Sequence, residues 1–563
     1  MPIKSRWTLS IPTISLPQFL FTSPTAILPH GQKPAFISVD DPSIYLTQDT
    51  FRLYASRFAA GLVRAGLQPG DRVLLFSGNN ILFPVVFMGI LMAGGVFTGA
   101  NPGYVARELA YQLKDSEARF LICADSSLEL GTEAAESIGM GEDRVFAFDD
   151  LLLSGGGKDR LGVRNWKVLV ESEKAGREFK WVEPKDPKSD VCCLNYSSGT
   201  TGVPKGVMIT HYNYISNAIQ YNYMPTLHPE HAERTKKAAW LCFVPMYHAM
   251  GQTIFITCGP QRGIPVYMMK KFDFVQMLES VQKFKITNLI MVPPIVVALA
   301  KSPLTKKYDL SSVRDLGSGA APLGGDVIRE AEALWPEGDR KLKQGWGMTE
   351  ATCSMLGWDP RLEAHPSSVG ELNPNCSAKI VSTDGDDFAE VTPGSRGEIW
   401  VQGPNIMKGY WRNPSATKEI FVDSPEGRWM RTGDIAYVDN QGRFFIVDRM
   451  KELIKVKGNQ VAPAELEGLL LEHPELDDAC VVGVTIGGEE MPRAYVVRKQ
   501  GGAVTEEGVK EWLGKRVSRT KRLTGGVVLV DAVPKNPSGK ILRKVLRERA
   551  QEEVGDKEIK AKL

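Results

Sequence analysis

The sequence predicts an α/β fold in which helices alternate with the buried strands of a largely parallel sheet. An amphipathic helical pattern at residues 51–66 is followed by short apolar runs at 72–76 and 120–123. Such alternation is typical of βαβ units. The pattern recurs at residues 238–244, 286–292 and 315–317. Because 563 residues exceed what one hydrophobic core supports, we expect two or more domains.

The most apolar stretch, residues 81–100, carries no charge and has the length of a membrane span. It contains one proline and four glycines, so we interpret it as a buried helix followed by a buried strand. Asn79 and Asn80 precede it and are candidates to cap the helix. The N-terminus does not resemble a signal peptide, because Pro12 and Pro17 interrupt its apolar residues.

The composition favours a soluble globular protein, with 43% hydrophobic and 24% charged residues. A net charge of +2 gives no strong attraction to nucleic acid or to an anionic membrane. The eight cysteines include no C-x-x-C pair, which argues against a zinc site or a disulfide framework. We expect most of them to be small buried residues in a reducing compartment.

The chain changes character three times after the first βαβ units. Residues 152–190 are polar and rich in glycine, lysine and aspartate, which predicts an excursion over the surface. Residues 370–447 contain many short strand patterns separated by Gly, Asp and Pro turns, which predicts a small β-barrel or a meander. From residue 448 helices and strands alternate again, which predicts a compact terminal domain.

The segment with the clearest chemical signal is residues 196–206, which combines hydroxyls, glycines and one lysine. Glycines let successive backbone N–H groups approach a phosphate, and a lysine adds positive charge. The spacing is not that of a Walker A loop, so a P-loop kinase or ATPase is disfavoured. The candidate phosphate ligands are Ser197, Ser198, Gly199, Thr200, Thr201, Gly202 and Lys205.

Further segments follow in a fixed order, and each sets functional side chains among small residues or turns. They are residues 244–251, 317–324, 344–350, 431–434, 448–467 and 534–540. With residues 196–206 they resemble the motifs of the adenylate-forming superfamily. This superfamily includes acyl-CoA synthetases, 4-coumarate–CoA ligases, beetle luciferases and the adenylation domains of peptide synthetases. The N-terminal part is similar to the fungal-type 4-coumarate–CoA ligase-like branch.

The resemblance implies the adenylate-forming enzyme fold. A large N-terminal AMP-binding domain, residues 1–447, would contain two βαβ-type subdomains and a β-barrel. A hinge at 448–451 would lead to a small mobile α+β lid domain at 452–563. Ligands would bind between the two domains, as is common for small-molecule sites.

The resemblance also implies an acid pocket and a nucleotide site. His248 would lie near the substrate carboxylate, and Tyr247, Met250, Gly319 and Gly345 would wall the pocket. The nucleotide site would comprise Gly319, Ala320, Ala321, Gln344, Gly345, Trp346, Gly347, Thr349, Glu350, Asp434 and Arg449.

Within this nucleotide site the resemblance gives each polar group a different task. Trp346 would stack on adenine, and Thr349 would contact the α-phosphate. Glu350 would hold Mg²⁺, a cation that prefers oxygen ligands. Asp434 would accept hydrogen bonds from the ribose hydroxyls, and Arg449 would reach the ribose or the phosphates.

The last two motifs match the family's hinge and its mobile lysine. Lys451 would be the hinge residue, and Lys540 would enter the site to neutralise charge during adenylation. The residues matching the thiol-transfer conformation are Lys455, Lys457, Gly458 and Gln460. Relatives commonly carry an aromatic residue where this chain has Asn459, so the details of CoA docking differ here.

The reaction implied by the resemblance uses ATP, Mg²⁺ and coenzyme A. A carboxylate attacks the α-phosphate of ATP to give acyl-AMP and pyrophosphate, and the CoA thiol then takes the acyl group. The expected substrate is an aromatic or phenylpropanoid-type acid, with a medium-chain fatty acid or a secondary-metabolite precursor as alternatives. Three other readings stay open: an enzyme that loads a carrier-protein thiol, a luciferase-like oxygenase, and a nucleotide-binding regulator without turnover.

The chain ends in Ala561, Lys562 and Leu563, which resemble the S-K-L peroxisomal address. They predict import into the peroxisome through its receptor, with the cytoplasm as the alternative. We expect no nucleic-acid partner and no membrane span. The sequence leaves the oligomeric state open between a monomer and a homodimer.

Overall fold

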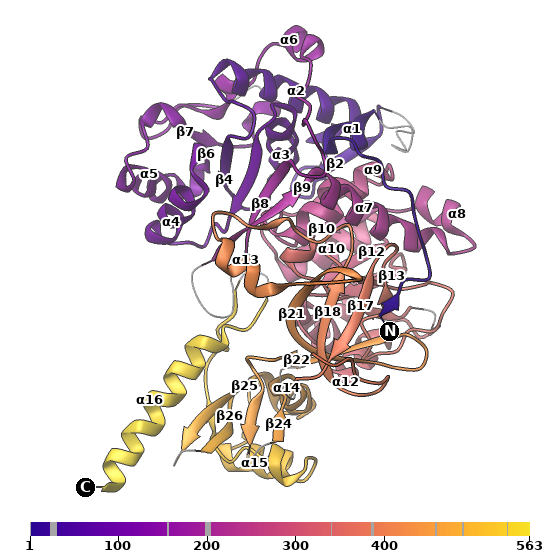
Figure 1. The fold of residues 1–563 in the computed structure, drawn as a ribbon, viewed down its shortest axis with the longest axis vertical. Coiled ribbons are helices and arrows are strands. Elements are labelled where there is room, and N and C mark those ends of the chain that lie inside the picture. Colours follow the sequence, from indigo (N-terminus) through magenta and orange to yellow (C-terminus); the bar gives the residue numbers. More distant parts are fainter. Residues whose placement is uncertain are drawn as a thin grey trace.

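The chain folds into a large body and a smaller C-terminal part that carries the last helix, α16 (Arg543–Lys562), as Figure 1 shows. The computed structural model describes residues 2–22, 31–154, 157–197, 204–338, 340–383, 388–456, 459–486, 489–536 and 539–562. Within these residues, two seven-stranded sheets and a six-stranded sheet form the body. The α/β fold with a large N-terminal and a small C-terminal domain is confirmed.

The first seven-stranded sheet has the order β19-β9-β8-β5-β4-β6-β7. Strands β8 to β7 along this order are parallel, whereas β9 and β19 add antiparallel edges. The strands are β4 (Arg72–Phe76), β5 (Val96–Ala100), β6 (Ala118–Ala124), β7 (Val145–Phe148), β8 (Val191–Ser197), β9 (Lys205–Thr210) and β19 (Gly409–Tyr410). Its helices are α2 (Gln48–Arg64), α3 (Phe83–Met92), α4 (Ala106–Ser116) and α5 (Leu128–Ser137).

The second seven-stranded sheet has the order β14-β13-β12-β10-β11-β2-β3, and only β3 is antiparallel to its neighbour. Its strands are β2 (Pro34–Ser38), β3 (Tyr45–Thr47), β10 (Trp240–Cys242), β11 (Val266–Met268), β12 (Asn288–Met291), β13 (Asp315–Ser318) and β14 (Leu342–Gln344). Its helices are α1 (Leu16–Phe21), α7 (His211–Thr226), α8 (His231–Lys236), α9 (Gly259–Gln261), α10 (Phe274–Phe284), α11 (Pro293–Lys301) and α12 (Gly325–Glu332). The predicted βαβ units are confirmed in both sheets.

One apolar core runs through both sheets, because their buried residues belong to a single cluster. Phe51 of α2 packs edge-on against Phe36 of β2, with ring centroids 5.2 Å apart. Phe87 of α3 packs in the same way against Phe97 of β5, at 4.8 Å. Edge-to-face packing of buried rings stabilises a core beyond the area that it buries. The two sheets therefore form one block that holds their loops in a fixed relation.

The apolar stretch 81–100 is a buried helix, α3, followed by the buried strand β5, as predicted. The capping prediction was wrong for Asn79, because helix α3 has Leu82 at its N-cap and no side-chain cap bond. Asn80 Oδ1 accepts a hydrogen bond from the Leu82 amide at 2.8 Å. Asn79 instead donates to the carbonyl of Val244 at 3.1 Å, so it belongs to a different loop.

Residues 152–190 are only partly a surface excursion. They contain α6 (Glu173–Glu178) and a short 3₁₀ turn whose Trp166 is fully buried. The indole of Trp166 packs on Phe58 and on Phe148, with centroids 5.4 and 5.1 Å away. A single buried tryptophan therefore anchors a segment whose composition is otherwise polar.

The six-stranded sheet is antiparallel and follows the path β1-β17-β18-β21-β20, with β22 beside β21. Its strands are β1 (Ile3–Lys4), β17 (Ser377–Val381), β18 (Gly397–Gln402), β20 (Phe421–Ser424), β21 (Gly427–Val438) and β22 (Phe444–Arg449). Nearby lie the pair β15 (Leu356–Gly357) and β16 (Glu371–Leu372), and helix α13 (Pro414–Ile420). Among the residues described, the pairing path is open, so a meander describes this region. The contribution of β1 was not predicted.

The small C-terminal part has apolar clusters that contain only residues from Ile454 onwards. Its elements are β23 (Ile454–Val456), β24 (Asn459–Val461), α14 (Pro463–Leu471), β25 (Leu476–Ile486), β26 (Glu489–Arg498), α15 (Glu506–Gly514), β27 (Gly526–Leu529) and α16. Strand β26 pairs antiparallel with β25 and parallel with β27. This is the α+β pattern expected for the terminal domain.

A buried ion pair joins the start of α16 to helix α14. Arg543 donates to the Glu467 carboxylate, whose other oxygen accepts a hydrogen bond from the Val481 amide at 2.8 Å. Burial raises the pKa of Glu467, and the Arg543 charge opposes that rise. Arg543 also attracts the buried carboxylate of Asp448, which accepts a hydrogen bond from the Ala464 amide at 2.9 Å. This arginine thus compensates two buried carboxylates near the end of β22.

Close contacts join the small part to the body. Lys301 of α11 donates to the carbonyl of Leu471, at the end of α14, over 2.9 Å. A cation at that position complements the negative end of the helix dipole. Gly324 and Gly468 approach so closely that a Cβ on Gly324 would lie 3.6 Å from the Gly468 Cα. A Cβ on Gly539 would lie 3.2 Å from the side chain of Pro294.

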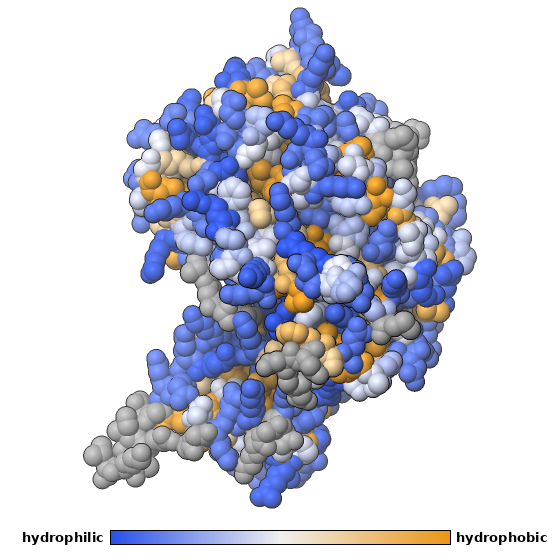
Figure 2. All heavy atoms as spheres, viewed as in Figure 1, coloured by the Kyte–Doolittle hydropathy of each residue, from blue (hydrophilic) through white to orange (hydrophobic). Residues whose placement is uncertain are grey.

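Hydrophilic residues predominate on the face drawn in Figure 2, and hydrophobic residues lie there in small groups. The outline is notched between the large body and the small part that carries α16. A search of the described residues finds no helix long and apolar enough to span a membrane.

We expect Arg543→Met to destabilise the C-terminal part by about 3 kcal/mol, because it leaves two buried carboxylates without their cation. Urea unfolding monitored by circular dichroism measures this loss. Lys544→Met is the matched control, since Lys544 lies next to Arg543 and its side chain is 74% exposed. Equal stabilities of the two variants would contradict the importance of the buried pair.

Candidate functional site

The predicted site residues follow the carboxyl ends of neighbouring parallel strands. Residues 244–251 come after β10, residues 319–324 after β13, and residues 345–350 after β14. Strands β10, β12, β13 and β14 are successive neighbours in one sheet, so their carboxyl ends lie on one edge. Such an edge is where open α/β sheets bind ligands. The fold therefore brings three separate motifs together.

His248 lies at the start of an unusual helical segment. Residues Gly251–Cys258 form a π-helix, a rare conformation that is frequent at functional sites. Burial lowers the pKa of His248 to about 4, so its imidazole is neutral at pH 7. A neutral imidazole carries one N–H donor and one acceptor. His248 is thus suited to orient a polar group without adding charge.

The turn before this π-helix is held tightly in place. A Cβ on Gly251 would lie 2.2 Å from the Pro245 carbonyl oxygen, so only glycine fits. Asn79 accepts a hydrogen bond from the Met246 amide at 2.9 Å. The Tyr247 hydroxyl donates to Asn101 Oδ1 at 3.1 Å. These contacts fix the backbone that presents His248.

Met250, Gly319 and Gly345 meet, as expected for walls of one pocket. A Cβ on Gly319 would lie 3.8 Å from the Gly345 carbonyl oxygen and 3.9 Å from Met250 Sδ. Gly345 is exposed, and Ala320 next to Gly319 adopts a positive φ of 75°. A positive φ is uncommon for alanine and marks a functional or strained position. Gly319 therefore lies between the Met250 side chain and the Gly345 backbone, with no side chain of its own.

Trp346, Asp434 and Arg449 form a second cluster. The Trp346 indole donates to Asp434 Oδ2 at 2.8 Å, and Arg449 Nε lies 3.3 Å from Asp434 Oδ1. Asp434 and Arg449 are cross-strand partners in β21 and β22. Burial raises the pKa of Asp434, and both Arg449 and Trp346 oppose that rise. Asp434 Oδ1 accepts no hydrogen bond from the described residues, so it is available to a ligand hydroxyl.

Glu350, Tyr410 and Lys205 form a third cluster. Glu350 lies in a 3₁₀ turn (Thr349–Ala351) and is 7% exposed. The Tyr410 hydroxyl donates to Glu350 Oε1 at 2.9 Å. The Lys205 ammonium lies 4.7 Å from the centre of the Tyr410 ring. The lysine of the candidate phosphate loop is therefore close to the candidate metal ligand.

Lys540 reaches this assembly from the C-terminal part. Burial lowers the pKa of Lys540 to about 8, and repulsion from Arg449 adds to the decrease. Asp434, Glu452 and Glu350 act in the opposite direction on the pKa of Lys540. The Lys540 amide donates to Asn536 Oδ1 at 2.9 Å. Groups from both domains thus share one electrostatic environment.

Other predicted residues lie outside the described part of the chain or lie on strands and turns outside the three clusters. Ser198, Gly199, Thr200, Thr201, Gly202, Lys457, Gly458 and Leu563 lie outside the described residues. Ser197 pairs with Lys205 across β8 and β9. Lys455 and Gln460 are cross-strand partners on the hairpin β23–β24. Lys451 is exposed just after β22.

The side chain of Gln344 holds its own loop. Its Oε1 accepts from the Leu323 amide at 3.0 Å, and its Nε2 donates to the Pro366 carbonyl at 2.6 Å. Gly347 is also constrained, since a Cβ there would lie 1.8 Å from the Cys353 carbonyl oxygen. These two residues therefore shape the segment that carries Trp346.

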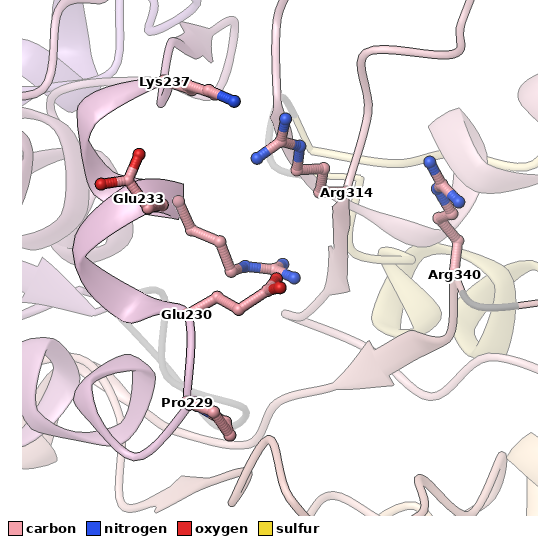
Figure 3. A pocket seen from close by; sticks show the side chains of 7 residues that line it. Pro229, Glu230, Glu233, Lys237, Arg314 and Arg340 are labelled. Atoms are coloured by element: carbon pink, nitrogen blue, oxygen red, sulfur yellow. The ribbon is translucent and has the colours of Figure 1, made fainter.

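A polar cavity of about 620 Å³ lies elsewhere, and Figure 3 shows the side chains that line it. They are Pro229, Glu230, Glu233, Arg234, Lys237, Arg314 and Arg340. These residues precede β10, β13 and β14, so they lie at the amino edge of the sheet. Arg234 is paired with Asp315 at 2.8 Å. The cavity is therefore separate from the predicted site at the carboxyl edge.

The sequence reasoning missed Tyr410 and Glu398. Glu398 accepts hydrogen bonds from the Gly433 amide at 2.9 Å and from Arg431 at 3.2 Å, so it holds the turn before Asp434. Tyr410 belongs to the short edge strand β19 and meets Lys205 only through long-range pairing. No local pattern around either residue signals these contacts.

Comparisons with known proteins agree with the geometry. Residues 26–411 match the AMP-binding enzyme family, and residues 465–540 match the AMP-binding enzyme C-terminal domain. The chain is 37% identical over 532 residues to phenylacetyl-CoA ligase epaB of Aspergillus niger, which covers 93% of this chain and 95% of that protein. It is 39% identical over 511 residues to 4-coumarate–CoA ligase 1 of Petroselinum crispum, with 89% of each covered. The crystal structure of ATP-bound MatB from Rhodopseudomonas palustris has a TM-score of 0.81 at 27% identity, covering 96% of this chain and 99% of that one.

The fold and the site define an adenylate-forming enzyme of two domains. The chain belongs to the AMP-binding enzyme family. The predicted resemblance is confirmed over most of the sequence.

We expect Arg449→Met to raise the pKa of Lys540 from about 8 toward its ordinary value of 10.5. The change removes the cation that repels the Lys540 ammonium. It also removes the arginine that competes with Lys540 for the negative charge of Asp434. Competitive labelling of amines with acetic anhydride at increasing pH measures the titration of Lys540. Arg443→Met is the control, because Arg443 is paired with Asp439 at the far end of the β21–β22 hairpin. An unchanged midpoint in Arg449→Met would contradict the assignment.

Proposed function

We propose that this chain, an ATP-dependent acid–CoA ligase of the AMP-binding enzyme family, acts on an aromatic or phenylpropanoid-type acid. The observation that carries the proposal is that Lys540 of the C-terminal part lies within electrostatic range of the cluster of Trp346, Asp434 and Arg449, and of Glu350. The named relatives that act on phenylacetate and 4-coumarate support the aromatic substrate. Gly319 beside Met250, with the Gly345 backbone next to it, suits a flat apolar group.

The proposed first step joins the acid to AMP. The buried Oδ1 of Asp434 accepts a ribose hydroxyl, and Trp346 offers its ring to adenine. His248, neutral at pH 7, orients the substrate carboxylate. The carboxylate oxygen then attacks the α-phosphate, and the bond to pyrophosphate breaks. Lys205 and Lys540 neutralise the charge that accumulates, an electrostatic stabilisation of the transition state.

Mg²⁺ is part of this proposal. In the described part of the chain no group of three or more His, Cys, Asp or Glu side chains could hold a metal alone. Mg²⁺ is commonly bound through one or two carboxylates together with substrate phosphates, and the buried Glu350, which shares Tyr410 as a neighbour with Lys205, fits that mode. When bound, the ion would neutralise phosphate charge and draw electrons from the reacting phosphorus.

The proposed second step needs a different arrangement of the domains. Rotation about Lys451 would withdraw Lys540 and bring the hairpin that carries Lys455 and Gln460 to the site. The CoA thiolate would attack the acyl carbon, and AMP would leave. A carrier-protein thiol is the alternative acceptor, and medium-chain fatty acids or secondary-metabolite precursors are the alternative acids.

We further propose import into the peroxisome through Ala561, Lys562 and Leu563, with the cytoplasm as the alternative. What supports this proposal is the similarity of these three residues to the S-K-L address. A monomer and a homodimer are both compatible with the proposed reaction.

We expect CoA-dependent AMP release with phenylacetate or hydroxycinnamates, in the presence of ATP and Mg²⁺, to exceed that with aliphatic acids of 6–18 carbons by at least about tenfold. Even one methylene group that mismatches a hydrophobic pocket costs on the order of 1–3 kcal/mol, or at least about tenfold in rate, and a chain in place of a ring is a larger mismatch. A coupled AMP assay across both groups measures it. A preference for aliphatic acids would contradict the proposed aromatic substrate but not the ligase activity.

We expect Lys540→Ala to reduce adenylate formation by roughly 10²–10³-fold while thioester formation from supplied acyl-AMP is retained. The lysine is needed only where the carboxylate meets the α-phosphate. ATP–pyrophosphate exchange measures the first step, and CoA consumption with synthetic acyl-AMP measures the second. Lys544→Ala, on the exposed face of α16, should change neither. An equal loss in both steps would overturn the assignment.

A further inference from the structure

Tyr410 connects two groups that the sequence places far apart. Its hydroxyl donates to Glu350 Oε1 at 2.9 Å, and its ring centre lies 4.7 Å from Lys205 Nζ. Tyr410 is 7% exposed, so both contacts are shielded from bulk water. One side chain therefore touches both the candidate phosphate lysine and the candidate metal ligand.

The backbone around Tyr410 is held from two sides. Strand β19 pairs with β9, where Tyr410 lies opposite Val207, and the Trp411 amide donates to the Gly206 carbonyl at 2.7 Å. On the other side, the Tyr410 amide donates to Thr417 Oγ1 at 2.9 Å. The strand that carries Tyr410 thus lies beside the strand that begins with Lys205.

The hydroxyl of Tyr410 is a hydrogen-bond donor at all physiological pH values. A tyrosine hydroxyl has an ordinary pKa of about 10, so it keeps the proton that it donates to Glu350 Oε1. A donor on Oε1 restrains the rotation of the Glu350 carboxylate and leaves Oε2 without this partner. The backbone of Glu350 is fixed as well, because its carbonyl accepts from the Met407 amide at 2.8 Å.

The ring of Tyr410 serves Lys205 in a different way. The face of an aromatic ring attracts an ammonium group electrostatically. Unlike a carboxylate, the ring does not neutralise the charge of the ammonium. Within the described residues Lys205 forms no ion pair, and its ammonium contacts the face of the ring whereas Glu350 contacts the hydroxyl. The cation and the anion are therefore held by different parts of one side chain.

We propose that Tyr410 is a positioning residue that holds the Glu350 carboxylate through its hydroxyl and the Lys205 ammonium over its ring, so that both are oriented for the metal–nucleotide complex. The inference rests on the proposed function, because it takes Mg·ATP as the ligand. Partners that orient a metal-binding carboxylate commonly contribute 10–100-fold to metal affinity. Tyr410 would thus affect how much Mg²⁺ adds to the affinity for ATP. It would not affect the contacts with the nucleoside.

The test is the ratio of ATP affinities with Mg²⁺ and with EDTA, measured by isothermal titration calorimetry on the full chain. We expect Tyr410→Phe to lower this ratio by roughly tenfold, because it loses the hydroxyl and keeps the ring. ATP affinity in EDTA should stay within twofold of wild type. Tyr410→Leu should also weaken binding in EDTA, since it removes the ring beside Lys205.

Tyr495→Phe is the matched control. Tyr495 is fully buried, and its hydroxyl donates to the Glu553 carboxylate at 2.9 Å, far along the chain in the C-terminal domain. This variant should keep the wild-type ratio. A Glu350→Gln background provides a second test, in which Tyr410→Phe should have no further effect on the ratio. A thermal unfolding midpoint within a few degrees of wild type shows that each variant is folded.

Several outcomes would overturn the role of Tyr410. An unchanged ratio in Tyr410→Phe would do so, and so would an equal loss with Mg²⁺ and with EDTA. An undiminished effect in the Glu350→Gln background would also contradict it. ATP–pyrophosphate exchange by the wild-type protein distinguishes this inference from the proposed function. If exchange occurs and the affinity ratio of Tyr410→Phe is unchanged, only the role of Tyr410 is refuted. If no acid supports exchange, the ligase function is refuted.

Discussion

The buried carboxylate of Asp434 is the constraint on which the rest of the site depends. A carboxylate removed from water needs compensating partners, and Asp434 obtains them from Trp346 and Arg449. These residues belong to different segments that meet only when the second sheet, the meander and β22 are all in place. Because β22 leads directly into the C-terminal part, the same requirement ties the position of that part to the site. Lys540 then enters an environment in which its own charge is only partly stabilised.

Much of this arrangement could be predicted from the sequence, because it depends on local chemistry. The apolar run at β4 and the order of the loops after β10, β13 and β14 are visible as patterns. Contacts that depend on long-range pairing are not. Strand β1 joins the meander across more than 370 residues, and Asn79 bonds to Val244 rather than to its neighbouring helix. Trp166 lies in a polar stretch, where composition hides its burial.

Tyr410 illustrates the same limit within the site. Its neighbours in sequence are Gly409 and Trp411, and none of the three residues signals phosphate or metal chemistry. Its relevance arises from the edge pairing of β19 with β9, which a motif search does not detect. The residues that motifs identified touch a ligand directly in the proposed reaction. Those that motifs missed, such as Tyr410 and Glu398, hold these residues in place.

The contact between Gly324 and Gly468 has a mechanical consequence. Two backbones meet there without side chains, so at this contact no interlocking side chains would have to part in the proposed rotation. Little apolar area is exposed when two glycines part, so the energy barrier from this contact is small. At this point the small part therefore contacts the body through backbone atoms alone. In the proposed rotation, the charged groups around Lys540 would stabilise the closed arrangement, and the glycine contact would add little to the free energy of opening.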